Sequence, residues 1–286
     1  MAQDTVGPGT GFAGAPAGRG SFPAPPDAAM PEPTPDLDVR LDGGVLHLSL
    51  ARPAKKNAIT RAMYAALADA LDGAADDPAV RAVVLSGSGG VFTAGNDLGD
   101  FLMDPPAGPD SPVFRFLRAA STFPKPLLAA VEGPAVGIGT TILLHCDLAY
   151  AAPDARFKMP FVDLGLVPEA ASSLLLPRAA GPMRAAGWLL FGEAFSAADA
   201  LAAGLVNEVV GDPTARALDR ARTLAAKPPE AVRLTKALLR RADATAVQET
   251  MAVEGAHFTE RLTSPEAQEA FTAFFEKRPP DFTRLG

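Results

Sequence analysis

The sequence predicts an α/β fold, and three stretches carry that prediction. Residues 79–89 form an apolar run that ends in glycines, which indicates a buried strand followed by a tight turn. Residues 126–152 contain a strand, a glycine-rich turn, a helix and a further strand. From residue 182 onward the pattern is almost entirely helical. Apolar strands that alternate with turns and helices are typical of α/β domains whose strands are covered on both faces.

Two further elements precede this pattern. The stretch VRLDGGVLHLSL, residues 39–50, alternates apolar and polar side chains around an Asp-Gly-Gly turn, which predicts a hairpin. Residues 59–77 place apolar side chains at helical spacing behind Thr60, a residue type that caps helices well. We therefore expect a hairpin and a helix ahead of the first buried strand.

The chain divides into three predicted regions. Residues 1–36 are rich in Pro, Gly and Ala and offer too little apolar surface to offset the entropy of ordering, so we expect a disordered tail. Residues 37–225 are expected to form the α/β core. Residues 226–286 are expected to form a helical C-terminal region.

Composition narrows the classes of partner. The formal net charge of −7 argues against nucleic acid or an anionic membrane as the main partner, although a phosphorylated small ligand stays compatible with it. The single cysteine, Cys146, excludes an intrachain disulfide and suits a reducing cytoplasm. We expect no membrane span, since no apolar run reaches ~20 residues, and no signal peptide. No histidine or cysteine cluster has metal-ligand spacing, so we predict no metal site.

Two glycine-rich turns, residues 87–98 and 132–141, invite a dinucleotide-binding interpretation. That interpretation fails, because Ile142 stands where the third glycine of a GxGxxG motif would fall. Glycines that only mark tight turns are one remaining interpretation. The other is that each turn presents a backbone N–H to the same ligand oxygen, which would create an oxyanion hole.

Four ordered motifs connect the chain with a known family. They are RPAKKNAIT (52–60), GSGGVFTAGNDLGDF (87–101), the stretch 130–173, and SAADALAAGLVNEVV (196–210). From about residue 37 to the C-terminus, the chain resembles the crotonase, or enoyl-CoA hydratase/isomerase, superfamily. The resemblance implies a spiral of ββα units and a helical C-terminal region that forms homotrimers or hexamers. It also implies an acyl-CoA substrate, in which coenzyme A is part of the thioester and not a tightly bound cofactor.

The resemblance assigns roles to individual residues. The backbone N–H groups of Asn96 and Ile138 would form the oxyanion hole. Coenzyme A would lie along the following residues: Ala54, Lys55, Lys56, Asn57, Ala94, Asp97, Leu98, Val136, Gly139, Phe274 and Lys277. The acyl group would occupy a pocket lined by Phe101, Phe161, Leu164 and Pro168, and bulky residues such as Phe114 and Leu117 would set its depth. Lys55 and Lys56 do form a basic spot on an acidic protein, but a solvated lysine pair with no ligand is an equal alternative.

The reaction depends on which carboxylates are present. Hydration in this family uses two glutamates, and the matching positions here hold Thr141 and Phe161. Neither side chain can serve as a general acid or base near neutral pH, so ordinary hydratase chemistry lacks its proton carriers. Glu169 remains, in a segment that resembles the single-glutamate Δ3,Δ2-enoyl-CoA isomerases. One base is sufficient to move a double bond.

Alternatives for Glu169 stay open at this stage. Pro168 followed by Glu169 is also a common helix start, in which the acid only complements the helix dipole. Asp163 is a reserve candidate for the base, and Ser172 and Ser173 could hydrogen-bond to Glu169. The predicted function is therefore an enoyl-CoA isomerase, with a hydratase or other crotonase-type reaction as one alternative and a non-catalytic acyl-CoA binder as another.

Overall fold

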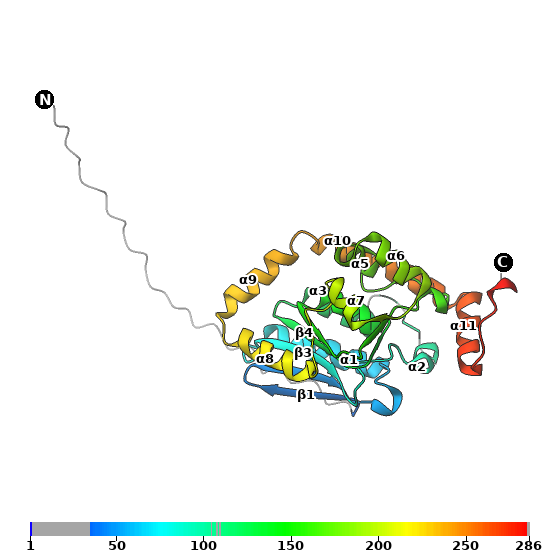
Figure 1. Cartoon of the computed structure of the whole chain (residues 1–286), viewed down its shortest axis with the longest axis horizontal. Helices are drawn as coiled ribbons and strands as arrows, with labels where there is room; N and C mark the ends of the chain where they lie inside the picture. The colour runs from blue at the N-terminus through cyan, green and yellow to red at the C-terminus, as the bar shows by residue number, and fades with distance from the viewer. Residues whose placement is uncertain (2–34, 104, 107, 109, 285–286) are drawn as a thin grey trace.

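Six strands form the main sheet of the protein, in the order β1-β2-β3-β4-β6-β9. A computed structural model describes residues 1, 35–103, 105, 106, 108 and 110–284 (Figure 1). β1 and β2 run antiparallel, and each later pair in this sheet runs parallel. The strands are β1 Leu37–Asp42, β2 Val45–Leu50, β3 Ala82–Gly87, β4 Leu127–Val131, β6 Leu148–Ala151 and β9 Glu208–Val209. The predicted α/β class is confirmed, whereas the predicted tail lies almost wholly outside the described residues.

A smaller sheet has the order β5-β7-β8. It consists of β5 Pro134–Val136, β7 Arg156–Lys158 and β8 Phe195–Ser196. The helices of the core are α1 Arg61–Asp76, α2 Leu98–Met103, α3 Pro112–Thr122, α4 Ile138–Thr141, α5 Ser172–Ala180, α6 Pro182–Phe191, α7 Ala197–Ala202 and α8 Pro213–Ala225. Short 3-10 helices are η1 Pro53–Lys55, η2 Ile142–His145 and η3 Val162–Leu164.

The predicted hairpin and first helix are both present. Gly43 and Gly44 join β1 to β2 with φ values of +56° and +80°, a two-residue turn that glycine adopts without steric cost. Thr60 caps α1, because its hydroxyl accepts a hydrogen bond from the Met63 amide at 3.3 Å. Local sequence chemistry therefore fixes both boundaries.

The central strands are buried on both faces, as their apolar runs predict. β4 is buried at all of its positions, and β3 at all but the last. One face, which includes Val83 and Leu85, packs into the larger core beneath α1 and α3. The other face, which includes Val84 and Leu128, packs against α8. The sheet is thus a rigid platform whose connecting loops carry the site.

The C-terminal part of the chain is helical. After α8 come α9 Pro229–Arg240, α10 Ala244–Leu262, α11 Pro265–Glu276 and the short η4 Phe282–Arg284. Figure 1 shows α9 arching away from the sheet and α10 returning along α5. α11 packs against η3, so the C-terminal helices reach the segment that precedes Glu169. In the part of the chain that the structure describes, no helix is both long and apolar enough to cross a bilayer.

Candidate active site

The two glycine-rich turns lie side by side. The Thr93 amide donates to the Pro134 carbonyl, and the Val136 amide donates to the Thr93 carbonyl, both at 3.0 Å. Close packing requires glycine here: a Cβ on Gly133 would lie 2.4 Å from the Gly90 carbonyl oxygen. The backbone of one turn therefore approaches the other directly, as an oxyanion hole built from two turns requires.

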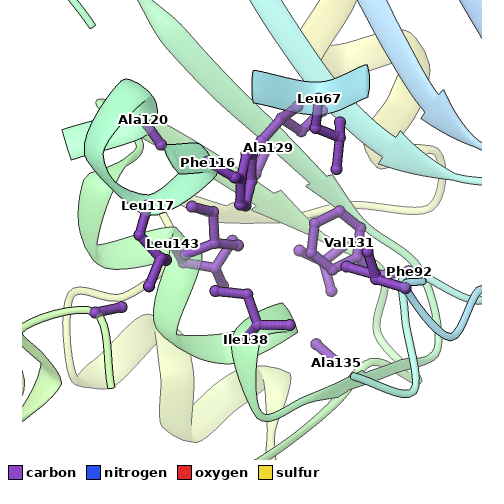
Figure 2. Close-up of a cluster of buried hydrophobic side chains, with 14 of the residues drawn as sticks. Leu67, Phe92, Phe116, Leu117, Ala120, Ala129, Val131, Ala135, Ile138 and Leu143 are labelled. Atoms are coloured by element: carbon purple, nitrogen blue, oxygen red, sulfur yellow. The ribbon is translucent and has the colours of Figure 1, made fainter. Parts of the chain in front are cut away.

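Among the backbone amides in these turns that have no acceptor within the described part of the protein, two match the positions expected for an oxyanion hole. They belong to Asn96 and to Ile138, the first residue of α4. The N–H groups of a first helical turn have no partner inside the helix, so they are available to a ligand. The side chain of Ile138 is buried in the core beside Ala135 and Leu143, as Figure 2 shows, so it does not reach the cavity.

Tyr64 fixes the orientation of Asn96. Its hydroxyl donates a hydrogen bond to the Asn96 Oδ1 atom, and its ring packs against Phe116 at 5.7 Å between centroids. Tyr64 is fully buried, and burial, followed by the charge of Glu169, raises its pKa well above the ordinary value. The hydroxyl therefore stays protonated and acts as a donor.

Glu169 is a buried carboxyl group. Its side chain is 5% exposed, and its Oε1 atom has no hydrogen-bond partner among the described residues. Burial, and then the nearby Glu254 carboxylate, raise the pKa of Glu169 to about 8, while a hydrogen bond from Thr141 opposes the rise. An isolated carboxyl group with a raised pKa is suited to accept and return a proton near neutral pH.

The helix-start interpretation of Glu169 is wrong. α5 begins at Ser172, three residues later, so Pro168 is not the first helical residue. Ala170 and Ala171 separate Glu169 from the helix, and both adopt left-handed conformations, with φ of +59° and +53°. Such a conformation costs on the order of 1–3 kcal/mol for each non-glycine residue and persists only where surrounding contacts enforce it. Glu169 therefore lies outside the helix, in the buried lining of the cavity described below.

A cavity of about 590 Å³ contains these elements. Asn96 and Gly137 line it on the side of the two turns, and Glu169 lines it as well. Phe101 and Phe258 form part of its apolar wall and meet edge to face at 6.2 Å. The cavity is large enough for the reacting part of a small-molecule substrate, and its wall is mostly apolar, with Glu169 as the buried acid among the carboxylates that line it.

Comparison with known proteins agrees with this geometry. Residues 40–284 match the family model described as Enoyl-CoA hydratase/isomerase. The chain belongs to the enoyl-CoA hydratase/isomerase family. A crystal structure of an enoyl-CoA hydratase/isomerase from Pseudoalteromonas atlantica T6c has a TM-score of 0.82 at 47% identity, over 87% of this chain and 100% of that one. The crotonase-type fold expected from the motifs is thereby confirmed.

Relatives within the enoyl-CoA hydratase/isomerase family differ in their named reactions. The chain is 37% identical over 249 residues to enoyl-CoA delta isomerase 2 of Rattus norvegicus, covering 84% of this chain. It spans only 63% of that relative's length. It is also 35% identical to 2,3-dehydroadipyl-CoA hydratase of Escherichia coli K12, over 86% of this chain and 98% of that protein.

The cavity of this family member contains many of the residues that the sequence singled out. Those that line it are Glu169, Asn96, Lys55, Ala94, Asp97, Leu98, Val136, Phe274, Phe101, Phe161 and Leu164. The cavity lining does not include Ile138, Ala54, Lys56, Asn57, Gly139, Pro168 and Lys277. Ala54, Lys56 and Lys277 are exposed, whereas Gly139 and Ile138 are buried. Phe114 and Leu117 do not line the cavity either.

Asn57 has a structural part in its loop. Its side-chain oxygen accepts from the Arg52 amide at 2.9 Å, and its side-chain nitrogen donates to the carbonyls of Ser88 and Val91 at 2.9 and 2.6 Å. These bonds tie the loop of residues 52–57 to the first glycine-rich turn. Asn57 is fully buried, so any contact with coenzyme A would come from its neighbours.

The other acids near the cavity are already paired. Asp163, the reserve candidate for the base, lies 3.2 Å from the Lys158 ammonium group and its side chain is 48% exposed. Asp97 pairs with Arg52 at 2.6 Å and accepts from the amides at the start of α2. Asp100 accepts from the Arg61 amide at 2.6 Å. Glu169 differs from all three in being buried with an unpartnered oxygen.

Several site residues were missed from the sequence. Phe258, Phe271 and Phe275 come from α10 and α11 and line the cavity, and Glu254 on α10 contacts the turn after Glu169. Glu254 and Phe258 are one helical turn apart, on the buried side of α10. An acid on the buried stripe of a helix is the signal that could have found Glu254.

Proposed function

We propose that this protein is a Δ3,Δ2-enoyl-CoA isomerase that converts a 3-enoyl thioester of coenzyme A into the conjugated 2-enoyl thioester. The observation that carries the proposal is Glu169, a buried acid that lines the cavity and has one oxygen without a hydrogen-bond partner among the described residues. The family resemblance places the two hydratase glutamates at Thr141 and Phe161, so Glu169 would act without a second acid. A double-bond shift needs only one proton carrier, whereas addition of water needs the water activated as well.

The proposed reaction moves one proton between two carbons. The ionised Glu169 carboxylate removes a proton from C2 of the 3-enoyl thioester, and the electron pair spreads over the diene and the thioester oxygen as a dienolate. The Glu169 carboxylic acid then returns the proton to C4, which places the double bond between C2 and C3. No water, electron or second reactant is consumed, so a single carboxyl group is regenerated in each cycle.

The dienolate needs stabilisation at its oxygen. The unpaired N–H groups of Asn96 and Ile138 would donate to that oxygen, and the hydrogen bond from Tyr64 would hold the Asn96 side chain in place during the reaction. Backbone donors in a site closed to water supply stabilisation without reorganising, and removing one such donor costs about 10²–10³-fold in rate in other enzymes. Side chains of Asn96 and Ile138 need play no chemical part.

Coenzyme A would be held as part of the substrate. Lys55 lines the cavity and, with the exposed Lys56, could attract the phosphates of coenzyme A on an otherwise acidic protein. Phe101, Phe258 and Phe271 would hold the acyl chain, because their rings form an apolar wall. We place the reaction in the cytoplasm, where a single reduced cysteine is stable.

A hydration reaction is the second candidate, favoured by the similarity to 2,3-dehydroadipyl-CoA hydratase. The test is to supply the purified protein separately with a 3-enoyl-CoA and with crotonyl-CoA, and to follow formation of the conjugated thioester and loss of conjugation. We expect rapid isomerisation and hydration slower by at least about 10²-fold, the rate contribution of one missing general acid or base. Hydration as fast as isomerisation would contradict the isomerase assignment. If the protein catalyses neither reaction, a non-catalytic acyl-CoA binder is favoured instead.

A further inference from the structure

The turn that aims Glu169 is held from two sides by side chains remote in sequence. On one side Glu254, from α10, accepts from the Ala171 amide at 2.6 Å through Oε2. Its Oε1 atom accepts from the Ser173 amide at 2.9 Å and from the Ser173 hydroxyl at 2.5 Å. A carboxylate only accepts hydrogen bonds, so these three donors match its ionised form.

The opposite side of the turn contacts His145, at the end of η2. The His145 Nε2 atom lies 2.7 Å from the Ala170 carbonyl oxygen. Because a carbonyl oxygen only accepts, this nitrogen carries the proton. Burial lowers the pKa of His145 to about 4, so the ring stays neutral through the pH range in which an enzyme of this kind works. The Ala170–Ala171 turn is therefore bonded through its carbonyl on one side and through its amide on the other.

The contacts of Glu254 and His145 hold a backbone conformation that would otherwise relax. Ala170 and Ala171 both have positive φ, and neither is glycine, so the isolated chain would leave this conformation. Any relaxation would rotate the residue before them, which is Glu169. Glu254 is 6% exposed and is not among the residues that line the cavity, so it does not reach the substrate itself.

We propose that Glu254 is a positioning residue, which clamps the strained Ala170–Ala171 turn and thereby holds the Glu169 carboxyl group in the cavity. This inference rests on the proposed function only in its expected effect on the rate of isomerisation. Its negative charge has a second effect, because a carboxylate close to Glu169 makes ionisation of Glu169 harder. The titratable groups that face Glu169 are Glu254 from α10 and Tyr64 from α1, and Tyr64 stays neutral.

The test compares Glu254→Gln with Glu249→Gln, a neutralised acid on an exposed part of the same helix. In Glu254→Gln we expect kcat for 3-enoyl-CoA to fall by about tenfold or more while KM changes less than about threefold, since only orientation is lost. Carbon-13 NMR of labelled glutamate side chains should show Glu169 titrating at lower pH, because a neighbouring negative charge has been removed. Hydrogen exchange at the amides of Ala171 and Ser173 should become faster. Glu249→Gln should match the parent in all three measurements.

A second variant separates orientation from charge and covers the case in which Glu254→Gln fails to fold. Glu254→Asp keeps the charge but is one methylene too short to reach both amides, so kcat should fall and exchange should quicken without Glu169 titrating lower. A folded Glu254→Gln or Glu254→Asp protein with the parent's kcat and the parent's exchange at Ala171 and Ser173 would overturn the proposal. If the parent itself fails to isomerise 3-enoyl-CoA, the proposed function is wrong, while the exchange and NMR measurements still decide whether Glu254 holds the turn.

Discussion

At the scale of single residues, the chemistry of the site depends on how far burial moves the ionisation of Glu169. Water is excluded from one of its oxygens, and a second carboxylate lies close by, so the neutral acid is favoured. The proposed reaction would then start from a base that is mostly protonated at neutral pH. A pKa near the working pH also means that the carboxylic acid formed after proton removal can readily give that proton back.

This matching predicts the pH dependence of the reaction. Only the ionised form of Glu169 can start the reaction, so kcat/KM should rise with pH and level off above the Glu169 pKa of about 8. Initial rates measured between pH 6 and pH 9.5 with 3-enoyl-CoA would test this. A rate that is flat across the range would show that Glu169 is already ionised at neutral pH, in conflict with its burial.

The same burial predicts a pH-dependent loss of stability. Below pH 4.5 the carboxyl group is protonated in both folded and unfolded chains, whereas between pH 4.5 and about 8 only the unfolded chain ionises. Folding therefore becomes less favourable as pH rises, by about 1.4 kcal/mol per pH unit. The stability of Glu169→Gln relative to the parent should increase by on the order of 4 kcal/mol between pH 4.5 and pH 8.

Urea unfolding of both proteins at each pH measures this difference. Any constant penalty for burying the glutamine amide cancels, because only the change with pH is compared. Glu260→Gln, which alters an exposed acid on α10, serves as the control and should show no such trend. A difference between Glu169→Gln and the parent that stays constant with pH would mean that Glu169 is ionised in the folded protein.

At the scale of elements, the sequence identified those parts of the site that local chemistry determines. The two glycine-rich turns could be recognised because close backbone approach demands glycine at positions such as Gly133. Glu169 could be recognised only through the family resemblance, which places the two hydratase glutamates at Thr141 and Phe161. In contrast, Glu254 meets its partner Ala171 across 83 residues, and no local pattern records that contact. Tyr64 was missed because it lies within an otherwise apolar helix stripe.

The contribution of α10 to the acyl pocket is open to a direct test. Phe258 is 3% exposed and packs edge to face on Phe101, so Phe258→Ala should leave a cavity and lower the free energy of unfolding by about 3–5 kcal/mol. The enlarged pocket should also shift preference, measured as kcat/KM across a series of 3-enoyl-CoA substrates, toward longer acyl chains. Val253→Ala, on an exposed position of α10, is the control. Unchanged chain-length preference would place the acyl group elsewhere.

At the scale of the whole molecule, the exposed apolar side chains need an explanation. Leu234, Leu238 and Leu239 on α9 are 49%, 70% and 80% exposed. Contiguous exposed apolar residues on a helix are typical of protein interfaces. We propose that α9 packs against further copies of this chain in a homotrimer, or in a hexamer of paired trimers. The family resemblance assigns trimer formation to the helical C-terminal region, and α9 is part of that region.

Sedimentation measures this assembly. The parent should sediment with three or six times the 29.5 kDa mass of one chain. Leu238→Glu should shift the protein toward monomers, because a buried unpaired charge costs several kcal/mol at an interface. Leu41→Glu, the same exchange on an exposed residue of β1, should leave the mass unchanged. A parent that sediments as a monomer would contradict the proposed assembly.

The central claim is that Glu169 is the single proton carrier, and one comparison of rates tests it most directly. The variants are Glu169→Gln and Asp163→Asn, which neutralise the two acids proposed from the sequence for this role. We predict that kcat for isomerisation of 3-enoyl-CoA falls about 10²–10⁴-fold in Glu169→Gln, the usual contribution of a positioned acid or base, and changes less than about threefold in Asp163→Asn. A folded Glu169→Gln protein that isomerises 3-enoyl-CoA as fast as the parent would contradict the account.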